Sequence, residues 1–205
     1  MRLSRPLIAA LASTWLIAAA PPQQHWTGSW ASSQQIPEER NALAPADLTD
    51  VTLRQVVHLS IGGPLLRVRI SNAFGSAPLA IDAAHVALAA KPGSAAIVAG
   101  SDRALTFGGQ PDVIVPAGAD YWSDPVALGA PPLSSLTVSL HLPAPPAQQT
   151  SHPGSRATSY LASGNHVGDS DLPGARTMEH WFNLSGIEVA GSGHSAIVTL
   201  GDSIT

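Results

Sequence analysis

The sequence LRVRIS at residues 66–71 decides the fold class, because apolar and polar side chains alternate along it. Alternation with a period of two is typical of a β-strand that has one buried face and one face in water. The sequence LTVSLHL at residues 136–142 repeats this alternation. Both stretches predict half-buried strands, and together they indicate a mainly β protein.

Short strands of this kind recur from Trp26 to Val189, and turn residues separate them. Glycine and proline supply the breaks, for example at Gly62-Gly63-Pro64 and at Lys91-Pro92-Gly93. No long stretch has a helical period with capping residues. We therefore predict that residues 24–190 form one antiparallel β-sandwich that is jelly-roll-like. The other predicted strands are Trp26–Ala31, Val51–Leu59, Ile81–Ala89, Arg103–Phe107, Asp112–Val115, Ala157–Leu161 and Trp181–Val189.

The composition excludes several classes of function. The 205 residues include 10 Lys and Arg against 14 Asp and Glu, a formal net charge of −4, so we expect no nucleic-acid partner. The sequence contains no cysteine, which excludes disulfides, thiol catalysis and cysteine-rich metal sites. None of the eight histidines forms a His-x-x-x-His pair. We therefore expect no metal site.

Residues 1–20 have the pattern of a signal peptide. Arg2 and Arg5 precede an uncharged stretch that ends at Ala20 and is too short to span a bilayer comfortably. Small residues allow cleavage after Ala19 or Ala20, and the loss of both arginines would change the formal net charge from −4 to −6. We therefore expect a periplasmic or extracellular protein with no stable membrane anchor.

The last ten residues differ in kind from the rest of the sequence. Residues Ala196–Leu200 form a continuous apolar run rich in β-branched side chains, which is typical of a strand buried on both faces of a parallel sheet. The sequence GDSIT follows at residues 201–205. A serine at the carboxyl end of such a strand faces a helix N-terminus, where its own N–H can donate to a developing oxyanion. Ser203 is therefore a candidate nucleophile.

This motif resembles the Gly-Asp-Ser-[Leu/Ile] turn of the SGNH (GDSL) family of serine hydrolases. The resemblance implies that residues 191–205 begin a flavodoxin-like α/β hydrolase domain, which is incomplete at residue 205. It also implies that Ser203 is the nucleophile and that Gly201 and Asp202 shape the turn.

The upstream sequence looks like the β-rich first domain of a bacterial two-domain subfamily of this family. The stretches that carry this likeness include WTGSWA at 26–31, VRISN at 68–72 and LTFGG at 105–109. In the family, the glycine and asparagine oxyanion donors and an Asp-x-x-His pair would all follow residue 205. Without a base the serine keeps its proton near neutral pH, so we expect the 205-residue chain alone to be inactive.

The resemblance implies that the intact parent hydrolyses an ester through an acyl-enzyme on Ser203, with no cofactor. The substrate would be a small-molecule or glycan acyl ester. Two alternatives stay open: a tight turn whose Asp202 and Ser203 bond only to the backbone, and a non-catalytic sandwich that binds carbohydrate through its aromatic residues. A second triplet, Gly168-Asp169-Ser170, follows no predicted buried strand and precedes no predicted helix, so we do not expect it to be the nucleophile motif.

Histidine and tryptophan residues have simpler interpretations than catalysis. His58, His85 and His141 lie in predicted strands, where we expect surface or hydrogen-bonded structural roles. Trp26 and Trp30 are four residues apart, which in a regular strand places both on one face. We expect the aromatic residues to serve the core or a domain contact more than to stack on sugar rings.

Overall fold

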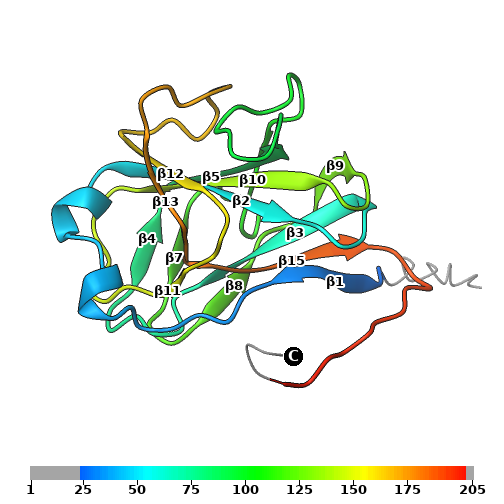
Figure 1. The fold of residues 1–205 in the computed structure, drawn as a ribbon, viewed down its shortest axis with the longest axis horizontal. Coiled ribbons are helices and arrows are strands. Elements are labelled where there is room, and N and C mark those ends of the chain that lie inside the picture. The colour runs from blue at the N-terminus through cyan, green and yellow to red at the C-terminus, as the bar shows by residue number, and fades with distance from the viewer. Residues whose placement is uncertain (1–23, 202–205) are drawn as a thin grey trace, which may run out of the picture.

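The computed structural model describes residues 24–201, which fold into two layers of antiparallel β-sheet (Figure 1). The predicted signal peptide and the residues after Gly201 lie outside the described residues. The only helices in the described part are two single turns of 3₁₀ type, η1 (Glu39–Asn41) and η2 (Pro45–Leu48). Within residues 24–201, no helix has the length and apolar character that a membrane span requires.

The first sheet has the strand order β1-β15-β3-β8, and β9 also pairs with β3. The second sheet has the order β13-β12-β2-β10-β5-β6, and all pairs in both sheets are antiparallel. The strands of the first sheet are β1 (Trp26–Ala31), β15 (Leu184–Ala190), β3 (Gly63–Ser71), β8 (Asp120–Trp122) and β9 (Val126–Ala130). Those of the second are β13 (Arg176–Met178), β12 (Ser159–Ser163), β2 (Val51–His58), β10 (Ser135–Leu142), β5 (Ala83–Leu88) and β6 (Arg103–Ala104). Two small ribbons join β11 (Ser151–Pro153) to β14 (His180–Phe182) and β4 (Leu79–Ile81) to β7 (Val113–Val115).

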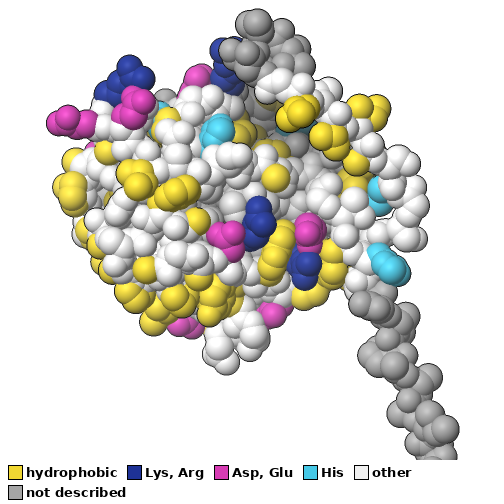
Figure 2. All heavy atoms as spheres, turned by 90° about the horizontal axis from the view of Figure 1, so that it is seen from below, with side chains coloured by type: hydrophobic (Ala, Val, Ile, Leu, Met, Phe, Trp, Pro, Cys, Tyr) yellow, Lys and Arg dark blue, Asp and Glu magenta, His cyan; other side chains and the backbone are white. Residues whose placement is uncertain are grey.

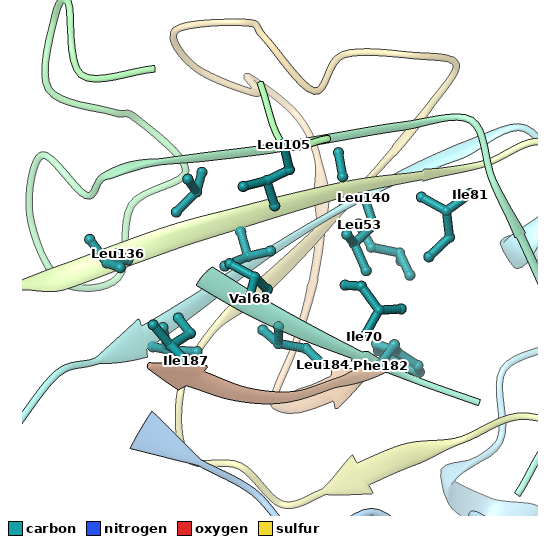
Figure 3. Close-up of a cluster of buried hydrophobic side chains, with 14 of the residues drawn as sticks. Leu53, Val68, Ile70, Ile81, Leu105, Leu136, Leu140, Phe182, Leu184 and Ile187 are labelled. Carbon is teal, nitrogen blue, oxygen red and sulfur yellow. The ribbon is translucent and has the colours of Figure 1, made fainter. Parts of the chain in front are cut away.

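The main core lies between the two sheets, where aliphatic side chains from both meet (Figure 3). Leu66, Val68 and Ile70 of β3 are fully buried, as are Leu136 and Leu140 of β10. The alternation at residues 66–71 therefore correctly indicated which side of β3 is apolar. This core confirms the predicted mainly β fold with antiparallel sheets.

The polar side chains of β10 are buried as well, contrary to the expected wet face. Thr137, Ser139 and His141 are all almost fully buried. Ser139 accepts a hydrogen bond from Arg54 (2.9 Å), and His141 bonds to Asp50 across 3.0 Å. Loops cover this side of the second sheet, so its central strand has no face in water.

Two of the predicted strands are each broken into two. Ile81–Ala89 is divided between β4 and β5, which meet different partners on either side of Asp82. Trp181–Val189 is divided between β14 and β15 at Asn183, which has a φ of +52°. Asparagine tolerates this left-handed conformation better than most residues, and it lets the chain leave the small ribbon and enter the first sheet.

Trp26 and Trp30 lie on opposite faces of β1, contrary to the prediction. The register between β1 and β15 shifts between Gly28 and Trp30, because a β-bulge inserts one extra residue. Trp30 therefore sits opposite the buried Ile187 and packs against the core. Trp26 instead contacts Arg67 on the outer face of the sheet.

Residues Ala196–Leu200 do not form the predicted strand. The chain from 191 to 201 has no strand structure, and Ile197, Val198 and Leu200 are 87–98% exposed. A parallel strand needs neighbours that accept and donate its backbone hydrogen bonds, and no described strand pairs with this segment. The flavodoxin-like strand thus remains a prediction from sequence.

One buried cation holds the loops on the outside of the second sheet. Arg54 of β2 is fully buried, and its guanidinium donates to the carbonyl oxygens of Ala95 (2.8 Å) and Asp169 (2.7 Å). Burial lowers the pKa of Arg54 from its ordinary value, while the charge of Asp169 opposes this shift. A small apolar cluster of Val56, Ala95, Tyr160 and Leu172 surrounds the same region.

Replacing Arg54 with methionine is expected to lower the free energy of unfolding by about 3 kcal/mol, because several buried carbonyl groups lose a charged donor. Urea denaturation measures this change. The matched control is Arg40→Met, whose exposed ion pair with Glu38 should contribute less than about 0.5 kcal/mol. Equal effects of the two substitutions would show that Arg54 does not hold the loops.

Candidate functional site

The predicted nucleophile lies outside the described residues, together with Asp202. Gly201 is described, and it is exposed at the end of a segment without regular structure. The geometry of the Gly-Asp-Ser turn is therefore untested, and Ser203 stays a prediction.

His58, His85 and His141 each form a side-chain hydrogen bond, as expected for structural roles. His85 bonds to Asp102 (2.8 Å), and the buried His141 lies between Asp50 and Asp82. A serine partner occurs only at His58, whose Nδ1 lies 3.1 Å from the hydroxyl of Ser135. Among the described residues, no carboxylate bonds to His58, so this pair lacks the group that would orient the imidazole as a base.

The second triplet, Gly168-Asp169-Ser170, lies in a turn, and no strand leads directly into it. The carboxylate of Asp169 bonds to His166 (2.8 Å), and its backbone carbonyl accepts from Arg54 (2.7 Å). Ser170 is exposed, and its side chain forms no hydrogen bond within the described chain. The triplet therefore helps to hold the loop that covers the second sheet, and among the described residues no base bonds to the hydroxyl of Ser170.

The stretch LTFGG at 105–109, which carries part of the family resemblance, owes its shape to a carboxylate. Asp124 accepts hydrogen bonds from the hydroxyl of Thr106 (2.7 Å) and the N–H groups of Gly108 (3.1 Å) and Gly109 (2.7 Å). The bond from Thr106 and the two backbone bonds lower the pKa of Asp124. Both glycines have positive φ, a conformation in which Gly carries no steric cost.

Aromatic and cationic side chains form a brace on the outer face of the first sheet. The guanidinium of Arg67 lies between the rings of Trp26 (4.7 Å) and Trp122 (4.6 Å) and forms an ion pair with Glu188. Figure 2 shows this side of the molecule, where basic, acidic and hydrophobic side chains lie close together. Because Glu188 neutralises the charge of Arg67, the brace stabilises the sheet without leaving that cation for a ligand.

A hollow of about 430 Å³ lies at the other Trp pair. Trp30 and Trp181 meet edge to face, with ring centroids 4.8 Å apart, and both line the hollow. His58 and Ser135 line it too, beside Arg156 from the loop after β11. Sequence reasoning did not find this site, because its residues come from six separate segments of the chain.

A second hollow of about 400 Å³ adjoins the first and shares His58, Pro92 and Ser135 with it. Its walls are more apolar, and they include Val98 and Leu133. We call the two hollows together the double groove. It combines aromatic, hydroxyl and cationic groups in one depression, which is the usual make-up of a small-ligand site.

A histidine near the Trp pair has no hydrogen-bonded partner. Both ring nitrogens of His180 are buried without a bond in the described structure, and the ring stacks on Phe182 at 6.0 Å. Burial lowers the pKa of His180, while Glu179 raises it and His152 lowers it further. His180 is therefore neutral in the folded protein near pH 7.

Comparisons with known proteins identify no family for this chain, so a function has to be argued from the Gly-Asp-Ser motif and the geometry of the described residues. The chain matches no protein-family model and no curated protein. Within residues 24–201, no group of three or more His, Cys, Asp or Glu side chains could hold a metal ion.

Acid is expected to destabilise the fold through His180. In the unfolded chain, the imidazole of His180 takes up a proton as the pH falls through about 6.5. In the folded chain it takes up this proton only at a lower pH. The free energy of unfolding therefore decreases as the pH falls through this window. The decrease in melting temperature from about pH 7.5 to about pH 5.5 should therefore be smaller in His180→Gln than in the wild type. The control His25→Gln, at an exposed histidine whose side chain has no hydrogen bond in the described chain, should keep the wild-type decrease. Identical falls in all three proteins would contradict the assignment.

Proposed function

We propose that this chain is the N-terminal part of an exported serine ester hydrolase of the SGNH type. One observation carries the proposal: the sequence GDSI at 201–204 directly follows the apolar run Ala196–Leu200. The β-sandwich is then the first domain, and the hydrolase domain begins within residues 191–205.

The exposure of the apolar run supports this assignment. Ile197, Val198 and Leu200 are almost fully exposed, and leaving three such side chains in water costs free energy that burial in a sheet would recover. The segment also leaves the sandwich directly after β15, whose last residue is Ala190. A buried first strand of a second domain accounts for both features.

In the proposed reaction, the hydroxyl of Ser203 attacks the acyl carbonyl and gives its proton to a histidine base. The base passes this proton to the departing alcohol, which leaves an acyl group on the serine oxygen. Water then attacks the acyl-enzyme, the acid is released, and Ser203 regains its proton. The backbone N–H of the turn would donate to the oxyanion. The base would come from the Asp-x-x-His pair, which in the family lies well after the nucleophile turn.

A second candidate function is a carbohydrate-binding module. The hollow at Trp30 and Trp181 favours it, because sugar rings pack their C–H faces on aromatic side chains and bond to nearby hydroxyls. In this alternative the motif at Ser203 is only a tight turn. The nucleotide sequence after codon 205 separates the two candidates: an open frame with Asp-Gly soon after Thr205 and a late Asp-x-x-His favours the enzyme.

The hydrolase proposal predicts the outcome of an assay with an activated short-chain acyl ester. The 205-residue chain should show no turnover, because in the family the base for the nucleophile comes from an Asp-x-x-His pair that would follow residue 205. The product of a longer reading frame should hydrolyse the ester, and Ser203→Ala should lower kcat/KM by about 10³-fold or more.

The matched control is Ser170→Ala in the second Gly-Asp-Ser triplet, which should retain full activity because Ser170 is exposed and unbonded in the described chain. Turnover by the 205-residue chain that disappears on Ser203→Ala would contradict the need for a later base. Activity that survives Ser203→Ala in the longer product would remove Ser203 as the nucleophile.

A further inference from the structure

Two basic side chains of the described residues have neither an ion pair nor a hydrogen bond there: Lys91 and Arg156. Lys91 is the single lysine of the whole sequence. Every other described arginine is bonded to a carboxylate, a hydroxyl or a carbonyl group. These arginines are Arg40, Arg54, Arg67, Arg69, Arg103 and Arg176.

Both unpaired cations line the double groove, one in each hollow. Arg156 lines the hollow with the Trp pair, and Lys91 lines the more apolar hollow. Neither hollow is lined by an Asp or Glu side chain, although acidic residues outnumber basic ones in the sequence. A negative ligand would therefore meet two cations and no carboxylate among the side chains that line the groove.

Backbone strain at the rim of the groove also indicates a function. Arg156 has a φ of +53° and Leu133 a φ of +59°, a region that non-glycine residues adopt only at a cost. Leu133 is also 69% exposed, so burial does not compensate for its strain. Strain of this kind gathers where a ligand is held, and both strained residues line the double groove.

The polar and aromatic groups of the groove suit a sugar ring. The indole N–H of Trp181 donates to the carbonyl of Val56 (2.9 Å), so the polar edge of this ring is already satisfied. The Trp181 ring already packs on Trp30 (4.8 Å) and His152 (5.5 Å), so the Trp pair offers a ligand only the apolar surface that lines the hollow. Ser135 and Thr158 add hydroxyl groups to the same lining.

We propose that the double groove binds an acidic oligosaccharide, with carboxylate groups of the ligand at Arg156 and at Lys91. This inference rests on the carbohydrate-binding candidate above and adds the charge of the ligand. A cation in each hollow favours a chain with repeated carboxylates over an anionic lipid, which carries its charge at one end only. The apolar walls then pack against sugar rings.

Titration calorimetry of the full chain with two matched probes tests the proposal. The acidic probe is tetragalacturonate, and the neutral probe is the same tetrasaccharide with all carboxylates methyl-esterified. We expect binding of the acidic probe to be at least about tenfold tighter, because charge-assisted hydrogen bonds are stronger than neutral ones. Raising the salt from about 50 mM to about 500 mM should weaken it by about threefold or more.

Substitutions locate the site. Arg156→Gly should lower the affinity for the acidic probe by about tenfold. The melting temperature of this variant should stay at or above that of the wild type, because glycine adopts a φ of +53° without strain. Lys91→Gln should lower the affinity for the acidic probe by about threefold. The control Arg40→Gln removes the same charge from an exposed residue outside the groove and should bind as the wild type does.

Three results would overturn the proposal. Equal affinity for both probes would retain carbohydrate binding and remove the role of charge. Binding of neither probe would remove the carbohydrate function itself. Binding of myristate, displaced by Arg156→Gly, with no binding of tetragalacturonate would assign the groove to an anionic lipid. None of these results bears on Ser203, so the hydrolase proposal is tested separately.

Discussion

The guanidinium of Arg54 is the group on which the outer half of this sandwich depends. A guanidinium on the central part of β2 could not be buried without hydrogen-bond acceptors around it. Four carbonyl oxygens and one hydroxyl oxygen from three segments of the chain meet that need. The loops that supply them therefore have to lie on the sheet. Their position buries the polar side of β10 and shapes one wall of the double groove, because Pro92 belongs to the loop that Arg54 holds through Ala95.

Periodicity predicted the long strands well and the short ones poorly, for a physical reason. β3 and β10 have eight or nine residues each, enough to display an alternation that burial imposes. Three-residue strands such as β8, β11 and β13 display no period, so propensity alone could not separate them from loops. The bulge in β1 reversed the expected face of Trp30 because one inserted residue leaves no mark in the composition of the strand.

The two candidate sites differ in how far sequence could reveal them. Ser203 stands in a contiguous motif, so its candidate role is visible in the sequence although its geometry is not described. The double groove is the opposite case. Its residues are distant in sequence, and Arg156 and Leu133 adopt left-handed backbone without the glycine that usually signals such a turn. Only the folded arrangement brings the two unpaired cations to one depression.

The first and last strands of the sandwich are neighbours, and this has a mechanical consequence. Trp26 pairs with Ala190, and just beyond this pair the carbonyl of His25 accepts from the N–H of Gly191 (3.1 Å). Antiparallel hydrogen bonds lie across the strands, so a force that pulls the two flanking segments apart loads one residue pair at a time. The sandwich would open as a zipper from this corner, under far less tension than a sheared sheet withstands, with β1 peeling away before the core between the sheets is disturbed.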